Sequence, residues 1–363
     1  MTIFSQIARI SSVLTRMEIK MRDVVIFGLD ASEPYAARVA RHLDLTASAV
    51  TDQQFDDGEG YVKSNVNVRG KHVYVIHSLY SDNKNTAGGK LIKLYMFLCS
   101  LRDASAGSVT VICPYMAYAR QDRKTESRAP IATKYVAQLL EAAKIDRFIT
   151  IDVHNLSAMQ NSFRVPTDHL EAKNLIADFL CGGVASDGLP IENHVPNPLA
   201  EDPENIVILS PDSGGLGRCR RFRNALEKRL KLSNQISVHT LDKERSDNKV
   251  KGGKIDGDIA NKKVIIFDDM ISTASTMKLC IDTVEKQGGK LWAACASHGL
   301  FVGNAPNHLK TAPRLIVTDT IPPFRMPKDD WAGRLFVIPT TKLVAQTIRR
   351  TYENGSISAL LED

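Results

Sequence analysis

The stretch VIIFDDMISTASTM, residues 264–277, contains the motif that best defines the fold class. Residues 264–267 form a continuous apolar run, as expected of a strand buried on both faces of a parallel sheet. Asp268 and Asp269 end this run, and the small and hydroxyl residues 272–276 open a helical pattern. Ligands of doubly wound sheets bind beyond the carboxyl ends of the strands. The stretch therefore predicts an α/β strand–turn–helix unit with a ligand site in its turn.

The same alternation of apolar strand and amphipathic helix continues along almost the whole chain. Predicted strands cover residues 23–28, 73–78, 109–113, 148–152, 206–210, 236–241, 291–297, 315–320 and 336–339. Predicted helices cover residues 32–43, 91–101, 131–143, 170–180, 215–230 and 273–286. Continuous apolar strands separated by amphipathic helices are typical of parallel sheets covered on both faces. We therefore predict two doubly wound α/β domains with mainly parallel sheets.

Two polar segments interrupt this pattern. Residues 182–203 are rich in glycine, proline and acid and have no period, which indicates a surface insertion. Residues 246–257, SDNKVKGGKIDG, are polar, contain glycine and directly follow a predicted strand. Segments of this kind are typical of mobile loops. We therefore expect a mobile loop over residues 246–257.

Length and charge restrict the class of partner. The 363 residues are enough for two domains of roughly 150 residues each. The net charge is +6, of which residues 1–22 supply +3 from four basic residues and one acidic residue. The rest of the chain lacks the strong basic excess of nucleic-acid-binding proteins, and no apolar run reaches the roughly 18 residues of a membrane span. We predict a soluble protein that binds neither nucleic acid nor membrane.

The cysteines and the amino terminus bear on location. The six cysteines are scattered without a C-x-x-C pair, as expected of free thiols in a reducing compartment. Residues 1–21 are basic, contain serine and are nearly free of acid, which is typical of an organellar targeting segment but also of a simple extension. We predict a cytoplasmic protein, with a mitochondrion or another organelle as the alternative.

The turn after residue 267 has the composition of a sugar-phosphate site. Small and hydroxyl residues at a helix start let main-chain N–H groups surround a phosphate, and their hydroxyls add further donors. The adjacent carboxylates of Asp268 and Asp269 could accept hydrogen bonds from a sugar diol. Simple helix capping by Ser272 or Thr273 is the alternative, but it explains neither the carboxylate pair nor the remaining hydroxyls.

Three other strand ends have charged motifs. SPDSGGLGRCRRF, residues 210–222, combines Asp212 with a glycine turn and arginines, which fits an anion or a magnesium ion. ICPYMAYARQDRKTESRAP, residues 112–130, has four cations that suit a polyphosphate. In ITIDVHN, residues 149–155, Asp152 and His154 could ligate magnesium on a nucleotide. For each, a solvated surface or a structural role is the alternative.

A pair of cations stands at the start of the expected mobile loop. HTLDKERSDNK, residues 239–249, contains Lys243 and Arg245. Two cations on a closing loop could neutralise negative charge that develops during phosphoryl transfer. An exposed hairpin is the alternative interpretation.

Taken in order, the motifs resemble one family. They are FDDGE (55–59), VRGKHVYVIHS (68–78), PYMAYARQDRK (114–124), RAPIATKYVAQLLEAA (128–143), IDVH (151–154), SPDSGG (210–215), DKER (242–245), GDIANKKVIIFDDM (257–270), SHGLF (297–301), VTDTIP (317–322) and AQTIRRTYENGSIS (345–358). From about Val24 to Leu361 the chain is similar to ribose-phosphate pyrophosphokinase, also called phosphoribosyl pyrophosphate synthetase. The resemblance implies two phosphoribosyltransferase-like domains, over residues 22–172 for ATP and 173–348 for ribose 5-phosphate. It further implies that residues 349–363 pack back on the first domain.

The resemblance also implies a reaction and its residues. Family members transfer the diphosphoryl group of ATP to the anomeric hydroxyl of ribose 5-phosphate with magnesium, release AMP, and assemble as dimers stacked into hexamers. The catalytic positions are Lys243 and Arg245. The ATP positions are Phe55, Asp57, Gly58 and Glu59, contributed by a neighbouring subunit, and Arg120, Gln121 and His154. The ribose 5-phosphate positions are Asp268, Asp269, Ser272, Thr273, Ala274, Ser275 and Thr276. The metal positions are His154 and Asp212, and Asp152 is a further candidate from its place at the strand end.

Three departures from the family pattern leave alternatives open. Ser272 and Ser275 replace an aspartate and a glycine, and Arg164 stands where an aspartate is usual, which puts the common regulation by phosphate and ADP in doubt. Residues 182–203 and 326–333 have no counterpart in compact members. One alternative is a non-catalytic subunit that regulates an active paralogue, although such relatives tend to lose the catalytic cations that are present here. The other is a phosphoribosyltransferase, which explains neither ARQDRK nor a second full domain.

Overall fold

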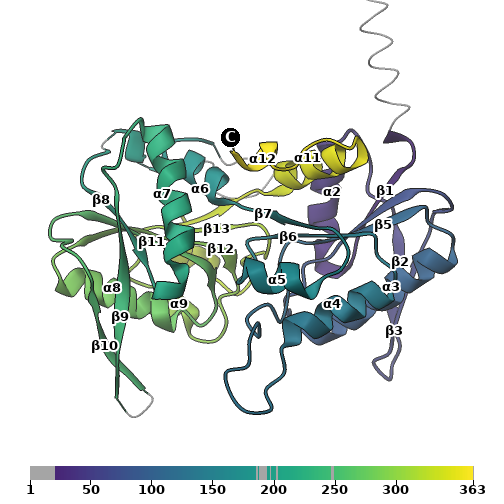
Figure 1. The fold of residues 1–363 in the computed structure, drawn as a ribbon, viewed down its shortest axis with the longest axis horizontal. Coiled ribbons are helices and arrows are strands. Elements are labelled where there is room, and N and C mark those ends of the chain that lie inside the picture. Colours follow the sequence, from purple (N-terminus) through teal and green to yellow (C-terminus); the bar gives the residue numbers. More distant parts are fainter. Residues whose placement is uncertain are drawn as a thin grey trace, which may run out of the picture. The chain divides into compact units, whose positions relative to one another are not determined.

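The computed structural model describes residues 21–184, 187, 194–196, 198–201, 203–246 and 249–362, without the side chains of residues 243–252 and 361–362. The predicted targeting segment and most of the expected insertion at residues 182–203 lie outside the described residues. The chain divides into two compact units, shown as a ribbon in Figure 1. Unit 1 comprises residues up to 113, 121–149 and 157–168; unit 2 comprises residues 114–120, 150–156 and 169–363.

The first unit is built on a five-stranded sheet in the order β1-β4-β5-β6-β7. Its strands are β1 (Val24–Gly28), β4 (His72–Ile76), β5 (Ser108–Cys113), β6 (Arg147–Ile151) and β7 (Thr167–Leu170). The helical elements are η1 (Asp30–Ser32), α2 (Glu33–Arg41), α3 (Ala87–Asp103), α4 (Ala132–Ala142) and α5 (Leu156–Ser162). Strands β1, β4 and β5 pair in parallel. Every residue of β1 is buried, as expected of a strand covered on both faces.

The second unit is built on a seven-stranded sheet in the order β10-β9-β8-β11-β12-β13-β14. Its strands are β8 (Ile206–Ser210), β9 (Ser237–Ser246), β10 (Lys249–Ile255), β11 (Lys263–Ile271), β12 (Lys290–Gly299), β13 (Leu315–Thr318) and β14 (Leu335–Ile338). The helical elements are α6 (Lys173–Leu180), η2 (Leu199–Glu201), η3 (Ser213–Gly215), α7 (Leu216–Leu230), α8 (Ser275–Lys286), α9 (Ala305–His308), α10 (Lys328–Trp331), α11 (Thr341–Tyr352) and α12 (Ala359–Glu362). Strands β8, β9 and β11–β14 pair in parallel, and β10 is antiparallel to β9.

The apolar core of unit 2 lies between this sheet and its helices. Val264 and Ile266 of β11 belong to it, together with Cys280 and Ile281 of α8. Alternate residues of β11 and one face of α8 therefore share a core, which fixes the turn between them. Trp331 of α10 is also in this core and only 4% exposed. The segment at 326–333 is thus part of the packed unit.

The prediction of a loop over residues 246–257 is wrong for the described residues, because residues 249–255 form β10. This strand pairs with β9 to make a hairpin that extends away from the other strands (Figure 1). At Gly253 a Cβ would lie 2.8 Å from Leu241 Cδ1, so a larger residue there would have to displace the Leu241 side chain. Main-chain hydrogen bonds hold the hairpin, and its polar sequence gives no strand period.

A second hairpin, of β2 (Val50–Gln54) and β3 (Gly60–Ser64), was not predicted either. Most of its residues are exposed or half-buried, so it lacks the apolar pattern by which strands are recognised. Among the described residues, no helix has the length and apolar character needed to cross a membrane.

Candidate active site

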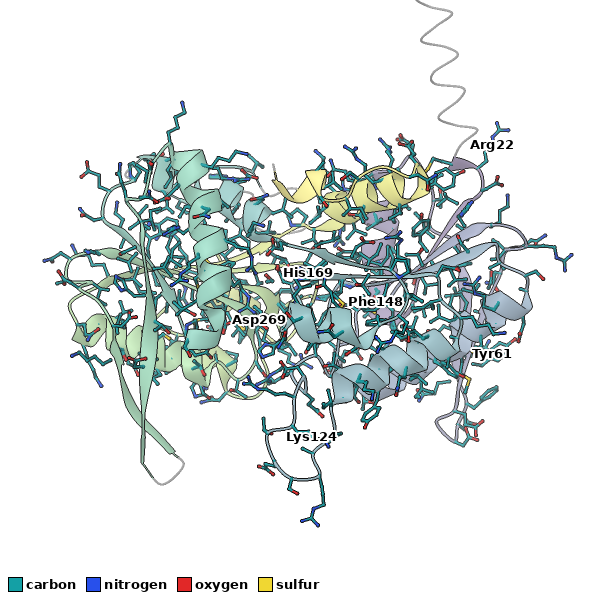
Figure 2. All side chains as sticks on the ribbon, viewed as in Figure 1. Arg22, Tyr61, Lys124, Phe148, His169 and Asp269 are labelled. Atoms are coloured by element: carbon teal, nitrogen blue, oxygen red, sulfur yellow. The ribbon has the colours of Figure 1, made fainter. Side chains whose placement is uncertain are left out.

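Two adjacent carboxylates lie near the carboxyl end of β11. Asp268 Oδ1 accepts a hydrogen bond of 2.8 Å from the main-chain N–H of Asp269. Asp269, which is labelled in Figure 2, is only 3% exposed, whereas a quarter of the Asp268 side chain is accessible. Parallel pairing places Asp268 opposite Ala296 of β12. The pair therefore lies near the carboxyl end of a central strand, which is where ligands of doubly wound domains bind.

Arg218, in the first turn of α7, forms ion pairs with both carboxylates. Its Nη1 atom lies 3.1 Å from Asp268 Oδ1 and 3.3 Å from Asp269 Oδ1. Nη2 donates to the main-chain oxygen of His154 at 3.4 Å. Burial would lower the pKa of Arg218, but the two carboxylates outweigh it and raise this pKa. The arginines of residues 210–222 are predicted to suit an anion, but Arg218, the first of them, is paired with two carboxylates of the chain itself.

His154 approaches the same carboxylates from the end of β6. Its Nδ1–H donates to Asp269 Oδ2 at 2.7 Å. Burial opposes ionisation of Asp269, but the hydrogen bond from His154 and the charge of Arg218 prevail, so the pKa of Asp269 lies well below its ordinary value. Burial and the neighbouring Asp269 charge raise the pKa of Asp268. One carboxylate of the pair is thus firmly ionised, and the other takes up a proton more readily.

The predicted phosphate-binding loop, residues 272–276, directly follows β11. Helix α8 begins at Ser275, two residues later than predicted, and Ala274 precedes it in the left-handed region with φ 59°. Thr273 and Ser275 are exposed, and their hydroxyl oxygens lie 3.1 Å apart. The loop is fixed by hydrogen bonds from Val302 N to Ser272 O, at 3.0 Å, and between His308 Nδ1 and Thr273 O, at 2.8 Å. Exposed hydroxyls and main-chain N–H groups at a helix start are donors that can bind an anion.

Asp212 is exposed and lies in the turn between β8 and α7. Its Oδ1 accepts a hydrogen bond of 3.2 Å from the N–H of Gly215 and so caps η3. A Cβ on Gly215 would lie 2.5 Å from Ser210 Oγ, which explains the glycine. Arg120, in the segment that leads away from β5, is also exposed and belongs to unit 2.

Asp152 is buried, unlike the other predicted metal positions. Its Oδ2 accepts hydrogen bonds from Ser297 Oγ at 2.5 Å and from the N–H of Ala172 at 2.9 Å. Its backbone is left-handed, with φ 40°. These contacts tie Asp152 to other parts of unit 2.

The predicted adenine contacts lie in unit 1, at the tip of the β2–β3 hairpin. Phe55 is 53% exposed. The tip is closed by hydrogen bonds from Phe55 N to Glu59 O and from Gly58 N to Phe55 O, at 2.8 and 2.9 Å. Gly58 has a φ of 91°, which favours glycine, and Asp57 Oδ1 accepts from Glu59 N at 3.0 Å. The tip therefore carries an exposed aromatic ring and the three exposed acidic residues Asp56, Asp57 and Glu59.

The remaining predicted residues are less fully described. Gln121 belongs to unit 1, and its main-chain oxygen accepts from Thr133 N at 3.3 Å. It lies in the segment that connects β5 to α4 along the chain, which includes a projecting loop with Lys124 (Figure 2). Lys243 and Arg245 lie in β9, opposite Gly253 and Val250 of β10, but their side chains are outside the described part.

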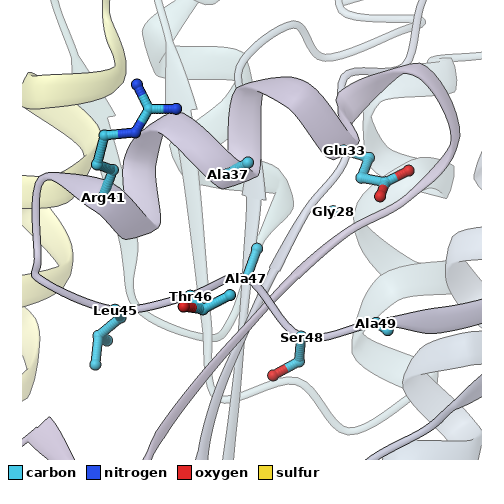
Figure 3. Close-up of a pocket in the computed structure, with 9 residues that line it drawn as sticks. All are labelled: Gly28, Glu33, Ala37, Arg41, Leu45, Thr46, Ala47, Ser48 and Ala49. Carbon is cyan, nitrogen blue, oxygen red and sulfur yellow. The ribbon is translucent and has the colours of Figure 1, made fainter.

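A cavity of about 380 Å³ lies in unit 1, between α2 and residues 45–49 (Figure 3). Glu33 and Arg41 of α2 and the hydroxyl residues Thr46 and Ser48 contribute to its lining. None of the residues predicted to bind a substrate lines this cavity.

Two family models match the chain. Residues 24–143 match the N-terminal domain of ribose phosphate pyrophosphokinase, and residues 218–362 match the phosphoribosyl synthetase-associated domain. The two matches fall on the two halves of the chain and together cover most of it.

Whole proteins are also similar over nearly their full lengths. Ribose-phosphate pyrophosphokinase 1 of Listeria monocytogenes is 32% identical over 340 residues, which are 93% of this chain and 96% of that protein. The Streptococcus pyogenes protein of the same name is 33% identical over 345 residues, covering 94% of this chain and 98% of its own. The crystal structure of phosphoribosylpyrophosphate synthetase from Mycobacterium smegmatis has a TM-score of 0.78 at 29% identity and covers 92% of this chain and 100% of that chain. The predicted α/β fold is confirmed, and the chain belongs to the ribose-phosphate pyrophosphokinase family.

Proposed function

We propose that this enzyme transfers the β,γ-diphosphoryl group of ATP to the anomeric hydroxyl of ribose 5-phosphate. The sugar oxygen forms a bond to the β-phosphorus, the bond from that phosphorus to the α,β-bridging oxygen breaks, and the hydroxyl proton is released. The products are 5-phosphoribosyl 1-pyrophosphate and AMP. The observation that carries the proposal is the Asp268–Asp269 pair beside the hydroxyl-lined start of α8, in a chain whose relatives have the names given above.

Ribose 5-phosphate would bind between Asp268 and Thr276. The main-chain N–H groups and hydroxyls of Ser272, Thr273, Ser275 and Thr276 would surround the 5-phosphate, with Ala274 in the left-handed turn that precedes α8. Asp269, ionised at neutral pH, would accept hydrogen bonds from the ribose hydroxyls. Ser272 cannot replace the carboxylate that is usual in relatives, so the pair at 268–269 would hold the sugar alone.

ATP would bind across a subunit boundary. Arg120, Gln121 and His154 would hold the triphosphate, and Phe55, Asp57, Gly58 and Glu59 of a neighbouring subunit would contact adenine. The exposure of the Phe55 ring supports this assignment, because a 53% exposed aromatic at a hairpin tip has area to bury against a base. The proposal therefore requires a homo-oligomer, which we propose is a hexamer of stacked dimers.

Magnesium fits this site if it binds together with the nucleotide. Among the described residues no group of three or more acids, histidines and cysteines could hold a metal ion by itself. Mg²⁺ bound with nucleotides takes most of its ligands from phosphates and water and only one or two from carboxylates. The exposed Asp212 carboxylate suits this role, with His154 as the second position. Asp152 is not proposed as a ligand, because its Oδ2 already accepts two hydrogen bonds inside unit 2.

The chain's own groups would do most of the catalytic work by positioning. A sugar hydroxyl is a weak nucleophile, so its alignment with the β-phosphorus and the neutralisation of the phosphate oxygens decide the rate. Lys243 and Arg245 would bring positive charge to those oxygens from β9. Magnesium, when bound, would add further positive charge at the phosphates.

The alternative is a non-catalytic regulatory subunit. The match of residues 218–362 to a domain described as phosphoribosyl synthetase-associated keeps this alternative open, whereas the presence of Lys243, Arg245 and His154 favours catalysis.

The test is AMP release from ATP by the purified full chain, with and without ribose 5-phosphate. We expect release only with the sugar phosphate. The Asp269→Asn variant should lose it, and the control Asp282→Asn, which removes a carboxylate paired with Lys278 within α8, should keep it. Absence of release from the unmodified chain would favour the regulatory role.

A cytoplasmic location is proposed for the enzyme, with an organelle as the alternative. All six cysteines are free thiols, which is typical of a reducing compartment. Fusing residues 1–21 to a fluorescent protein would test the alternative, which requires the fusion to enter an organelle.

A further inference from the structure

Two motifs, SHGLF and VTDTIP, have no part in the proposed substrate contacts. They end β12 and β13, which are adjacent strands of unit 2. Ser297, His298, Thr318 and Thr320 of these motifs are all buried. Thr318 Oγ1 donates to Ser297 O at 2.6 Å and lies 3.0 Å from Thr320 Oγ1. The two strand ends are thus joined by a connected set of polar side chains.

His298 connects these polar side chains to the backbone of residues 151–152. Its Nε2 lies 3.1 Å from Ile151 O and 3.2 Å from Asp152 O, and its Nδ1 lies 2.8 Å from Thr320 Oγ1. The ring also packs edge-on against Tyr115, with centroids 5.1 Å apart. Carbonyl oxygens only accept, so Nε2 must carry a proton. Burial lowers the pKa of His298, so the ring is neutral and the Thr320 hydroxyl donates to Nδ1.

The backbone that receives these bonds is in an unfavourable conformation. Asp152 has a φ of 40°, in the left-handed region that non-glycine residues rarely adopt. Such a conformation persists only where the surroundings hold it. Here Asp152 N donates to Leu170 O at 2.9 Å, Ser297 Oγ donates to Asp152 Oδ2 at 2.5 Å, and Val153 N donates to His169 Nε2 at 3.1 Å (His169 is labelled in Figure 2).

This turn controls where His154 lies. The His154 side chain is 40% exposed, so packing constrains it little and its backbone sets its direction. Two residues after the left-handed Asp152, His154 meets Asp269 Oδ2 at 2.7 Å. The β11–β12 register pairs Met270 with His298. His298, which holds the turn, and Asp269, which His154 must reach, therefore lie on neighbouring strands.

We propose that His298, supported by Ser297 and Thr320, is a positioning residue that holds the turn of residues 151–154 so that His154 reaches Asp269. This inference rests on the proposed function, in which His154 and Asp269 bind the substrates. His298 itself touches neither substrate. Its contribution is the N–H donor at Nε2, and the loss of that donor would leave two buried carbonyl oxygens with one partner fewer and release the turn.

Paired substitutions separate this role from simple packing. Glutamine can place an N–H where Nε2 lies, whereas the shorter asparagine can replace only Nδ1. Both amides are polar and smaller than histidine, so packing is lost in both. His298→Gln should therefore keep the turn, and His298→Asn should release it.

The experiment measures AMP formation by the full chain with each variant, together with its thermal unfolding. We expect His298→Asn to lower kcat by about 10- to 100-fold, as is usual when a supporting hydrogen bond of a site is removed. The KM for ribose 5-phosphate should stay near the wild-type value, because the loop at 272–276 is untouched. His298→Gln should recover most of the lost kcat. Equal losses in the two variants, or a loss explained by unfolding alone, would overturn the proposal.

A second readout does not depend on activity. The ¹⁵N signal of His154 Nδ1 reports its hydrogen bond to Asp269, and the Asp269→Asn variant supplies the signal without that carboxylate. His298→Gln should keep the wild-type signal, and His298→Asn should move it toward the Asp269→Asn position. An unmoved signal in His298→Asn refutes the positioning role whether or not the enzyme forms AMP. Absence of AMP formation by the wild type, with the expected ¹⁵N shifts, would refute the proposed function alone.

Discussion

Replacing Arg218 with methionine should destabilise the protein strongly, because Arg218 forms ion pairs with two adjacent carboxylates. The guanidinium lies 3.1 Å and 3.3 Å from their oxygens. At an effective dielectric constant of about 20, each pair contributes about 5 kcal/mol of Coulomb attraction. Desolvation of the buried charges offsets most of this sum, and removing one partner of a buried pair typically costs about 3 to 5 kcal/mol. We expect the free energy of unfolding to fall by about 3 kcal/mol, since Asp268 is partly exposed to water.

The pH dependence of this loss has a definite sign. The low pKa of Asp269 in the folded protein stabilises the fold above the unfolded pKa, and this stability is lost as the pH falls through the folded value. The raised pKa of Asp268 acts in the opposite sense, because its stabilising contribution is lost as the pH rises through the folded value. Without Arg218 both pKa values rise. The deficit of the variant should therefore be largest where both carboxylates are ionised and should shrink on acidification, as Asp268 and then Asp269 take up protons.

Urea unfolding of the wild type, Arg218→Met and Arg220→Met at pH 7 and pH 5 measures this effect. Arg220 is an exposed arginine on the same helix, so its variant controls for the change of residue type and for helix propensity. We expect a loss of stability for Arg218→Met alone. Equal stability of the two variants at pH 7, or a deficit that grows on acidification, would refute the neutralising role of Arg218.

Three further predictions concern other parts of the chain. Lys243→Ala should lower kcat by about two to three orders of magnitude while ATP still binds in a calorimetric titration; near-normal turnover would rule out its catalytic role. Phe55→Ala should weaken ATP binding about tenfold through the loss of stacking on adenine, with the affinity for ribose 5-phosphate unchanged as the internal control. Gly215→Ala should destabilise the fold by about 1 to 3 kcal/mol through overpacking, because a Cβ there would lie 2.5 Å from Ser210 Oγ, whereas Gly217→Ala, with no atom nearer than 3.8 Å, should be neutral or stabilising in a thermal melt.

The strands that the sequence predicts best are those with uninterrupted apolar runs. The continuous apolar runs of β1, β8 and β11 correspond to strands whose residues are mostly buried. It failed for β10, whose sequence KVKGGKI is polar and contains two glycines. That strand forms through main-chain hydrogen bonds to β9. Such bonds do not depend on the side chains, so the pattern of apolar residues does not predict them.

The candidate site was predicted only in part, for a related reason. Asp268, Asp269 and the hydroxyls that follow are contiguous, so a single stretch of sequence reveals them. Arg218 precedes the carboxylates by 50 residues, and His298 follows Ile151 by 147. Sheet register and packing bring these partners together, and a single sequence does not contain that information. The motifs SPDSGG and SHGLF did mark both regions, but they did not indicate which residues would be the partners.

A crystal structure of the enzyme with ribose 5-phosphate tests the central claim most directly. The account predicts the 5-phosphate at the main-chain N–H groups and hydroxyls of residues 272–276, with the ribose hydroxyls hydrogen-bonded to Asp268 or Asp269. A sugar phosphate bound away from β11 and α8, or a vacant loop at saturating ligand, would contradict it.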